Sequence, residues 1–85
     1  MYYYALPVRL QIYPNPTTDF IKIKEQENAS ENLTYLIINS SGRVIQSGIY
    51  NDEPINVKKL NSGLYFLNLS SKLNIKVFYG KFIKN

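Results

Sequence analysis

The 85-residue chain contains no cysteine, no histidine and no tryptophan. Because it has no cysteine, neither disulfide bonds nor a thiolate metal site can stabilise the fold, and apolar packing must do so alone. Because it has no histidine, the most frequent general base and the most frequent transition-metal ligand are missing. We therefore expect a protein that is not an enzyme and binds no cofactor. The scattered carboxylates match no metal-binding motif, so no metal site is expected at Glu25, Glu27, Glu31, Asp52 and Glu53.

Acidic residues are missing from the C-terminal third of the chain. Residues 1–53 carry four basic and six acidic side chains, whereas residues 54–85 carry six lysines and no acid. One explanation is a solvated, lysine-rich surface that protects strand edges against aggregation. The other is an anionic partner, a membrane surface or a receptor that reads the end of the chain.

Long apolar runs are also missing. No window approaches the roughly 20 consecutive apolar residues of a transmembrane helix. The start of the chain, MYYYALPVRL, lacks a charged leader followed by an apolar stretch, because Pro7 and Arg9 interrupt it, and it does not form a signal peptide. If the domain is exported, we expect the segment that takes it across the inner membrane to lie outside this sequence.

What the chain does contain is an alternation of apolar and polar residues with a period of two. Ile21 and Ile23 alternate with lysines, and Tyr65, Leu67 and Leu69 share one face of the segment 64–69. Turn signals recur roughly every 8–12 residues, and no helical apolar stripe is present. The pattern predicts an all-β fold, an antiparallel β-sandwich of about seven short strands. A small barrel and an incomplete sandwich that needs a partner strand are the alternatives.

Several local features refine this prediction. The segment 33–38 is apolar on both faces, which indicates a central strand or one that faces a second surface. Gly42 is expected to adopt a positive φ in a tight turn between this strand and residues 44–50. Gly48 suggests a bulge in the second arm of that hairpin. The last strand is expected over residues 75–83, with a bend at Gly80.

Three motifs occur in order along the chain. The first is Tyr13-Pro14-Asn15-Pro16-Thr17-Thr18-Asp19, in which both prolines fix φ and the polar side chains can hydrogen-bond to nearby backbone groups. The second is Asn39-Ser40-Ser41-Gly42-Arg43-Val44-Ile45. The third is Leu60-Asn61-Ser62-Gly63-Leu64-Tyr65-Phe66-Leu67, where Gly63 permits a turn and Tyr65 can hydrogen-bond backwards like a tyrosine corner. The chain closes with Lys81-Phe82-Ile83-Lys84-Asn85.

Together these motifs resemble the C-terminal sorting domain (type A, Por secretion system family) of proteins exported by bacterial type IX secretion. The resemblance covers residues 10–85 and leaves residues 1–9 as an N-terminal junction or linker; residues 70–80 depart from the family's usual last hairpin. It implies structural roles for Pro14, Asn15, Pro16, Asp19, Gly42, Arg43, Gly63 and Tyr65.

The resemblance also implies an immunoglobulin-like sandwich that acts as an address for a fused cargo in Bacteroidota-type bacteria. The cargo enters the periplasm by a separate signal peptide, and outer-membrane type IX secretion components recognise the domain. A sortase-like protease then removes it, with the cleavage region somewhere in residues 1–9. The cargo ends at the cell surface or is released as a secreted protein.

The terminal strand is the best candidate for recognition by the secretion machinery, because it combines charge with an edge that can pair with another sheet. The predicted residues are Lys81, Phe82, Ile83 and Lys84, with Lys76 as an addition. Core packing of the two apolar residues and simple solvation of the lysines are the alternatives. Deleting residues 81–85 is expected to leave a fused cargo in the periplasm. Exposed strand edges also allow a homodimer of the isolated domain.

Two other functions are compatible with the composition. A carbohydrate-binding or adhesion module requires an aromatic platform, for which the candidates are Tyr2, Tyr3, Tyr4, Tyr35, Tyr50 and Tyr79; the lack of tryptophan argues against it. The lysines and interleaved aromatics of the C-terminal third permit stacking and phosphate contact. No recognised nucleic-acid-binding motif is present, so no nucleic-acid partner is expected.

Overall fold

The computed structural model describes residues 8–9, 11–24, 33–51, 53–70 and 77–85. These residues form eight strands and no helix, so none of them contributes a helix long and apolar enough to cross a membrane. The predicted loop 25–32 lies outside the described residues. The strands are β1 Val8–Arg9, β2 Ile12–Tyr13, β3 Phe20–Ile23, β4 Leu33–Asn39, β5 Val44–Tyr50, β6 Ile55–Asn56, β7 Gly63–Ser70 and β8 Val77–Lys84.

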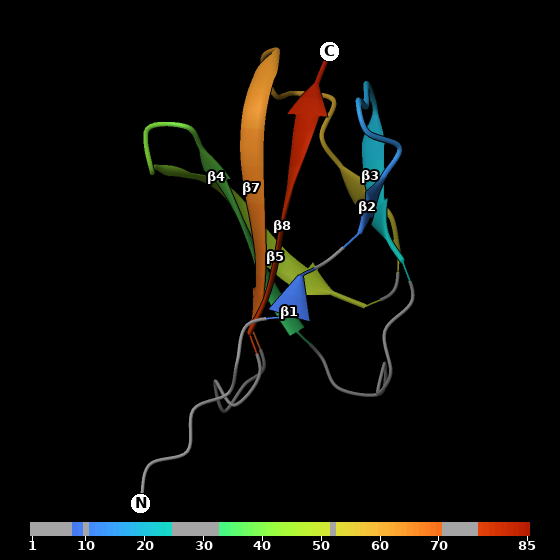
Figure 1. Ribbon diagram of the computed structural model, residues 1–85, viewed down its shortest axis with the longest axis vertical. Coiled ribbons are helices and arrows are strands. Elements are labelled where there is room, and N and C mark those ends of the chain that lie inside the picture. The colour runs from blue at the N-terminus through green and yellow to red at the C-terminus, as the bar shows by residue number, and fades with distance from the viewer. Residues whose placement is uncertain (1–7, 10, 25–32, 52, 71–76) are drawn as a thin grey trace, which may run out of the picture.

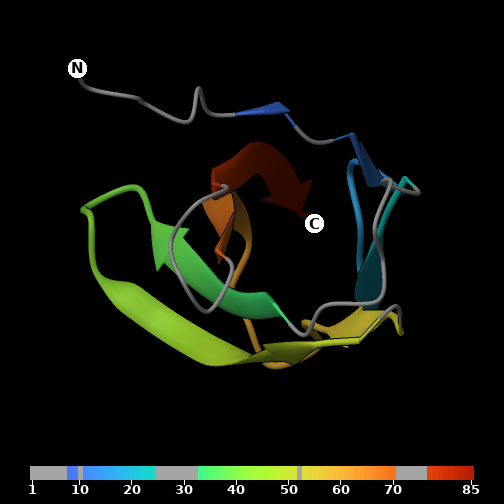
Figure 2. The same ribbon diagram turned by 90° about the horizontal axis from the view of Figure 1, so that it is seen from below.

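The strands form two sheets that enclose one core. The larger sheet has the order β1-β8-β7-β4-β5 and the smaller one β2-β3-β6. Figure 1 shows β4, β7 and β8 on one side of the molecule and β2 and β3 on the other. In Figure 2, β5 and β6 lie side by side where the two sheets approach, and the Gln46 side-chain amide donates to the carbonyl oxygen of Asn56 at 2.9 Å. The predicted all-β sandwich is confirmed.

One strand pairing departs from the antiparallel expectation. β1 runs parallel to β8, with Val8 opposite Phe78 and Arg9 opposite Tyr79, whereas the other pairings between the described strands are antiparallel. The isolated bridge between Thr17 and Lys84 is also parallel. After β1, the chain crosses to the small sheet, where it forms β2. These two consecutive strands therefore lie at the edges of different sheets.

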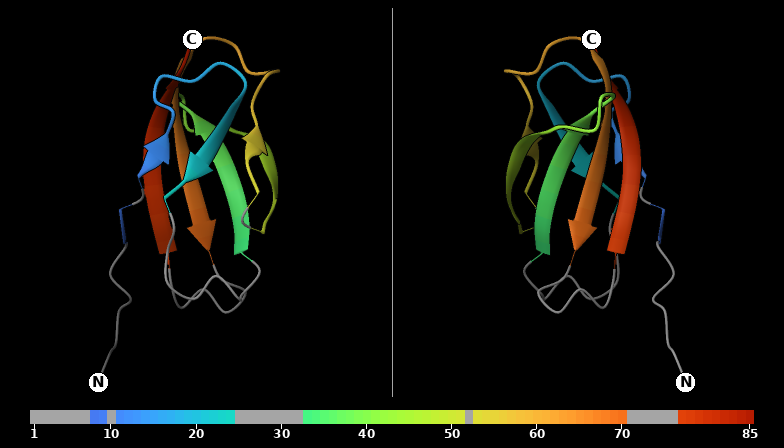
Figure 3. Two further views of the ribbon diagram at one scale, coloured as in Figure 1. Left: turned by 90° about the vertical axis from the view of Figure 1, so that its right-hand side faces the viewer. Right: turned by 90° about the vertical axis from the view of Figure 1, so that its left-hand side faces the viewer.

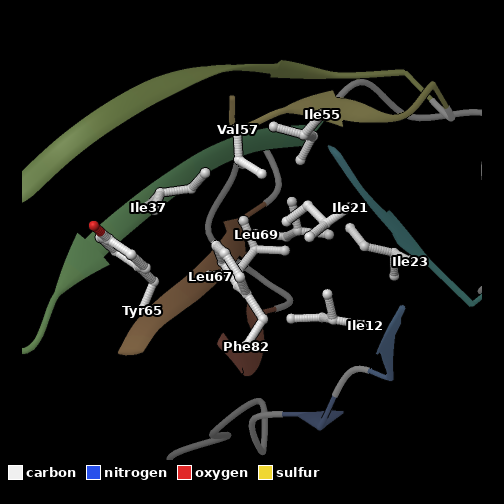
Figure 4. Packing of buried hydrophobic residues seen from close by; sticks show 10 residues of the cluster. All are labelled: Ile12, Ile21, Ile23, Ile37, Ile55, Val57, Tyr65, Leu67, Leu69 and Phe82. Carbon is white, nitrogen blue, oxygen red and sulfur yellow. The ribbon is translucent and has the colours of Figure 1, made fainter. Parts of the chain in front are cut away.

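The core fills the space between the sheets, as the period of two predicts. Both sheets contribute large aliphatic side chains, and β7 and β8 add one aromatic side chain each (Figure 4). A fully buried side chain of this size contributes about 1.5–3 kcal/mol to stability. The buried hydrophobic residues are Ile12, Ile21, Ile23, Ile37, Ile55, Val57, Tyr65, Leu67, Leu69 and Phe82.

β4 is a central strand, as its two apolar faces indicate. It pairs with β5 on one side and with β7 on the other. Ile37 is fully buried, and Leu33 and Tyr35 pack against the core from the same face. The opposite face, with Leu36 and Ile38, points away from the small sheet. The sandwich leaves this second apolar face half-exposed.

The hairpin between β4 and β5 has the predicted turn. Gly42 adopts a φ of 88°, which favours glycine. The Asn39 side-chain oxygen accepts hydrogen bonds from the backbone amides of Ser41 and Arg43, both at 3.0 Å. The Asn39 side chain thus organises the turn, a role that the sequence prediction missed.

The bulge predicted at Gly48 is wrong in position. The register shift lies between Ile37 and Ile38, opposite the step from Gln46 to Val44. Gly48 sits in regular register opposite Tyr35, and a Cβ added to it would lie 2.8 Å from the Tyr35 ring carbon Cε2. The glycine therefore makes room for an aromatic ring, and the Tyr35 hydroxyl accepts from the Gln46 amide at 3.2 Å. The pairing of β8 with β7 continues without a register shift at Gly80.

Candidate functional site

The predicted recognition residues lie on two opposite faces of β8. This strand pairs with β7 from Val77 to Lys84, so successive side chains alternate between the core and solvent. Phe82 and Lys84 point inward and are buried, whereas Lys81 and Ile83 point outward and are exposed. Lys76 lies outside the described residues. The structure thus separates the predicted set into an inner pair and an outer pair.

Phe82 is a core residue. Its side chain is 0% exposed, and its ring stacks on Tyr65 with the ring centres 5.6 Å apart. Tyr65 in turn donates from its hydroxyl to the carbonyl oxygen of Asn61 at 2.7 Å, which confirms the predicted backward hydrogen bond. The third motif and the end of the chain are therefore packed together as one unit.

Lys84 is also built into the fold. It is 7% exposed, and its ammonium donates to the carbonyl oxygen of Leu60 at 3.0 Å. Leu60 belongs to the turn between β6 and β7, where its amide donates to Val57. A lysine stem can cover apolar surface while its head reaches a polar partner. Lys84 joins the last strand to the third motif in this way.

The first motif covers the outer edge of β8. The edge that was predicted to be available for pairing with another sheet is therefore occupied along the last residues of this strand. The amide of Thr17 donates to the carbonyl oxygen of Ile83 at 2.9 Å, and the amide of Asn85 donates to the carbonyl oxygen of Thr17 at 2.8 Å. The Asn15 side chain accepts from the amide of Ile83 at 2.9 Å and donates to the carbonyl oxygen of Lys81 at 3.4 Å. We call Asn15, Thr17 and the backbone from Lys81 to Asn85 the clamp.

The polar residues of the first motif act over different distances. Thr17, 2% exposed, donates from its hydroxyl to the carbonyl oxygen of Phe20, the local hydrogen bond that was predicted. Asn15 instead bonds to residues 66 and 68 positions away. Asp19 acts through its backbone carbonyl, which accepts from the amide of Val57 at 2.8 Å. Pro14 and Pro16 flank Asn15, are exposed, and follow cis peptide bonds.

The second motif lies apart from the clamp. Its turn, with Gly42 and the exposed Arg43, connects β4 to β5 at the other edge of the five-stranded sheet from β8. Gly63, by contrast, starts β7 directly opposite Lys84. The structure therefore brings together the first motif, the third motif and the terminal strand.

Replacing Asn15 by alanine will destabilise the domain by about 1–2 kcal/mol, because two hydrogen bonds to β8 are lost. Urea denaturation of the 85-residue chain measures this change, and amide hydrogen exchange at Ile83 will become faster. Asn15→Asp is the matched control, since it keeps an acceptor for the amide of Ile83. Unchanged exchange at Ile83 in the alanine variant would contradict the clamp.

The alternative sites predicted from the sequence are not assembled by the described residues. Tyr35 and Tyr50 pack against the core, whereas Tyr79 is exposed on the opposite face of the sheet. These rings therefore do not share a platform, and Tyr2, Tyr3 and Tyr4 lie outside the described residues. The described part of the chain also holds no group of three or more potential metal ligands. Of the scattered carboxylates named above, only Glu53 lies within it.

The fold and the clamp define a small β-sandwich whose last residues are part of its core. A family model for the secretion system C-terminal sorting domain matches residues 11–85. The chain belongs to this family, and it is a C-terminal sorting signal for type IX secretion. Such a signal is attached to an upstream cargo, interacts with the type IX secretion machinery and directs export across the outer membrane. No curated protein matches the chain.

Proposed function

We propose that the domain is presented to the outer-membrane secretion machinery as a folded unit, after its cargo has reached the periplasm. The observation that carries this proposal is the position of the C-terminal strand. Phe82 and Lys84 are buried, and the clamp holds the backbone beside them, so the last five residues belong to the folded domain. What is available for recognition on this strand is its exposed face rather than a loose tail.

We further propose that a sortase-like protease removes the domain from its cargo on the N-terminal side of Val8. The support is the pairing of β1 with β8, which holds Val8 and Arg9 within the larger sheet. Backbone that is hydrogen-bonded in a sheet is a poor protease substrate. The domain itself contributes no catalytic residue to this step.

The test is a reporter protein fused upstream of residues 1–85, with a periplasmic signal peptide, in a strain with an active type IX system. We expect the reporter outside the outer membrane, and mass spectrometry of the released domain should show an N-terminus at or before Val8. A matched strain without the secretion apparatus is the control and should retain the fusion in the periplasm. Equal export from both strains would contradict the sorting function, and a released domain that starts after Val8 would contradict the cleavage proposal.

A further inference from the structure

The outer face of the five-stranded sheet carries an exposed apolar strip. Leu64 and Ile83 are direct partners on β7 and β8, and Phe66 pairs with Ile38, which pairs with Val44. Directly opposed side chains on one face lie about 4.5–5.5 Å apart at their Cβ atoms, so these residues are in contact range across four strands. Ile83 is 47% exposed and Phe66 38% exposed. The right-hand view of Figure 3 looks onto the strands that carry this strip, with the small sheet behind them.

This face differs from the outer face of the small sheet, which the left-hand view of Figure 3 shows in front. On β3, Lys22 follows the usual alternation and is exposed between two buried isoleucines. On β7, the positions that alternation would make polar are Leu64 and Phe66. Strands with apolar residues on both faces are normally covered on both faces. An exposed apolar patch of this kind marks a surface that binds another molecule.

The charged residues on the outer face of the five-stranded sheet restrict the kind of molecule that can bind there. Among the described side chains of β4, β5, β7 and β8, Lys81 is the one charged group that is exposed, and it lies opposite Phe66. The two described carboxylates, Asp19 and Glu53, precede strands of the small sheet. The described part of this face therefore holds no carboxylate that a second copy could offer to Lys81. A carboxylate on a different protein would complement its charge.

We propose that the outer face, formed by Val44, Ile38, Leu64, Phe66, Lys81 and Ile83, docks onto a protein of the type IX secretion machinery. The partner surface has an apolar centre and a carboxylate that pairs with Lys81. The proposal rests on the proposed function and names the surface that performs it. An apolar centre with polar groups at its rim is the usual composition of a protein interface. An anionic membrane is the weaker fit, since recruitment to it requires several basic residues together.

The test uses the reporter fusion with the whole 85-residue domain and two pairs of variants. Phe66→Thr removes an exposed aromatic ring from the outer face, and Phe20→Thr removes one that is 44% exposed on β3. Lys81→Glu and Lys22→Glu make the same charge change on the two faces. We expect about a tenfold loss of export for the Phe66 and Lys81 variants, the size of a modest interface hot spot. The β3 variants should export normally, and a cooperative melting transition above the temperature of the export assay shows that each purified variant is folded.

The outcomes separate the two proposals. If the unmodified fusion is retained, the sorting function and the docking surface both fail. If it is exported and the Phe66 and Lys81 variants are exported equally well, the docking surface alone is overturned. Analytical ultracentrifugation tests whether a second copy of the domain binds this face, and flotation with anionic phospholipid vesicles tests whether a membrane does. A dimer or vesicle binding that Phe66→Thr abolishes would assign the face to a second copy or to a membrane, against the proposal, whereas a monomer that does not float supports it.

Discussion

Replacing Phe82 by alanine will destabilise the domain by about 3–5 kcal/mol, the usual effect of truncating a fully buried phenylalanine. The ring is 0% exposed, stacks on Tyr65 and packs among core residues from both sheets. Small domains are stable by only about 5–15 kcal/mol in total, so this variant will be close to unfolding. Urea denaturation of the purified chain, followed by the circular dichroism of its tyrosines, measures the loss.

Phe66→Ala is the matched control for this prediction. It removes the same side chain from the adjacent strand, but on the exposed outer face. We expect a smaller loss of about 1–2 kcal/mol, because this ring is already 38% exposed in the folded domain and less of its area is buried. Equal destabilisation by the two variants would show that the inward and outward faces of the larger sheet are misassigned.

The burial of Phe82 changes how a truncation of residues 81–85 should be interpreted. The deletion removes a core ring, the lysine that bonds to Leu60 and the backbone that the clamp holds. A truncated domain will therefore fail to fold, and its retention in the periplasm would not separate recognition from folding. Single substitutions at exposed Lys81 are the informative experiment.

Most of the strands and most of the core were predictable because burial follows the period of two, whereas β1 lies in residues that were expected to form a junction or linker. Ile21, Ile23, Tyr65, Leu67 and Leu69 all point inward as their alternation requires. The hydrogen bond from Tyr65 was also predictable, since its partner is only four residues away. These features depend on local pattern, which the sequence carries directly.

The faces of β8 were harder to assign, although part of the signal was present. Side chains two residues apart share a face, so Phe82 had to be grouped with Lys84, and Lys81 with Ile83. Each pair contains one lysine and one apolar residue, and alternation alone does not reveal which pair points inward. The packing of Phe82 on Tyr65 decides this question, and that contact depends on the tertiary fold.

The clamp and the position of the bulge could not be predicted for a related reason. Asn15 meets β8 through contacts that span 66 and 68 residues, and no local pattern specifies which strand lies beside a turn. Gly48 marks a site where a side chain is excluded, but a bulge and an overlying ring both exclude one. The structure shows that the ring of Tyr35 is the cause.

Replacing Lys84 by alanine will destabilise the domain by about 2 kcal/mol, because the buried stem methylenes and the hydrogen bond to Leu60 are lost together. Lys84→Met keeps most of the stem and will recover about half of this loss, since a carbonyl without its donor costs about 1 kcal/mol or more. Lys81→Ala is the control on the opposite face and will change stability by less than about 0.5 kcal/mol. Urea denaturation of the three variants gives these values.

The same three variants distinguish a lysine that the secretion machinery recognises from a lysine that stabilises the fold. If Lys84 acts through packing, export of the reporter will follow stability across the Lys84 variants, and the methionine variant will be exported better than the alanine variant. Lys81→Ala will behave in the opposite way, with normal stability and reduced export, because its ammonium is exposed beside the apolar strip. A methionine variant that is as stable as the parent but not exported would show that the ammonium of Lys84 itself is recognised. Because this ammonium is buried in the fold, such recognition would require the end of the chain to leave the clamp first.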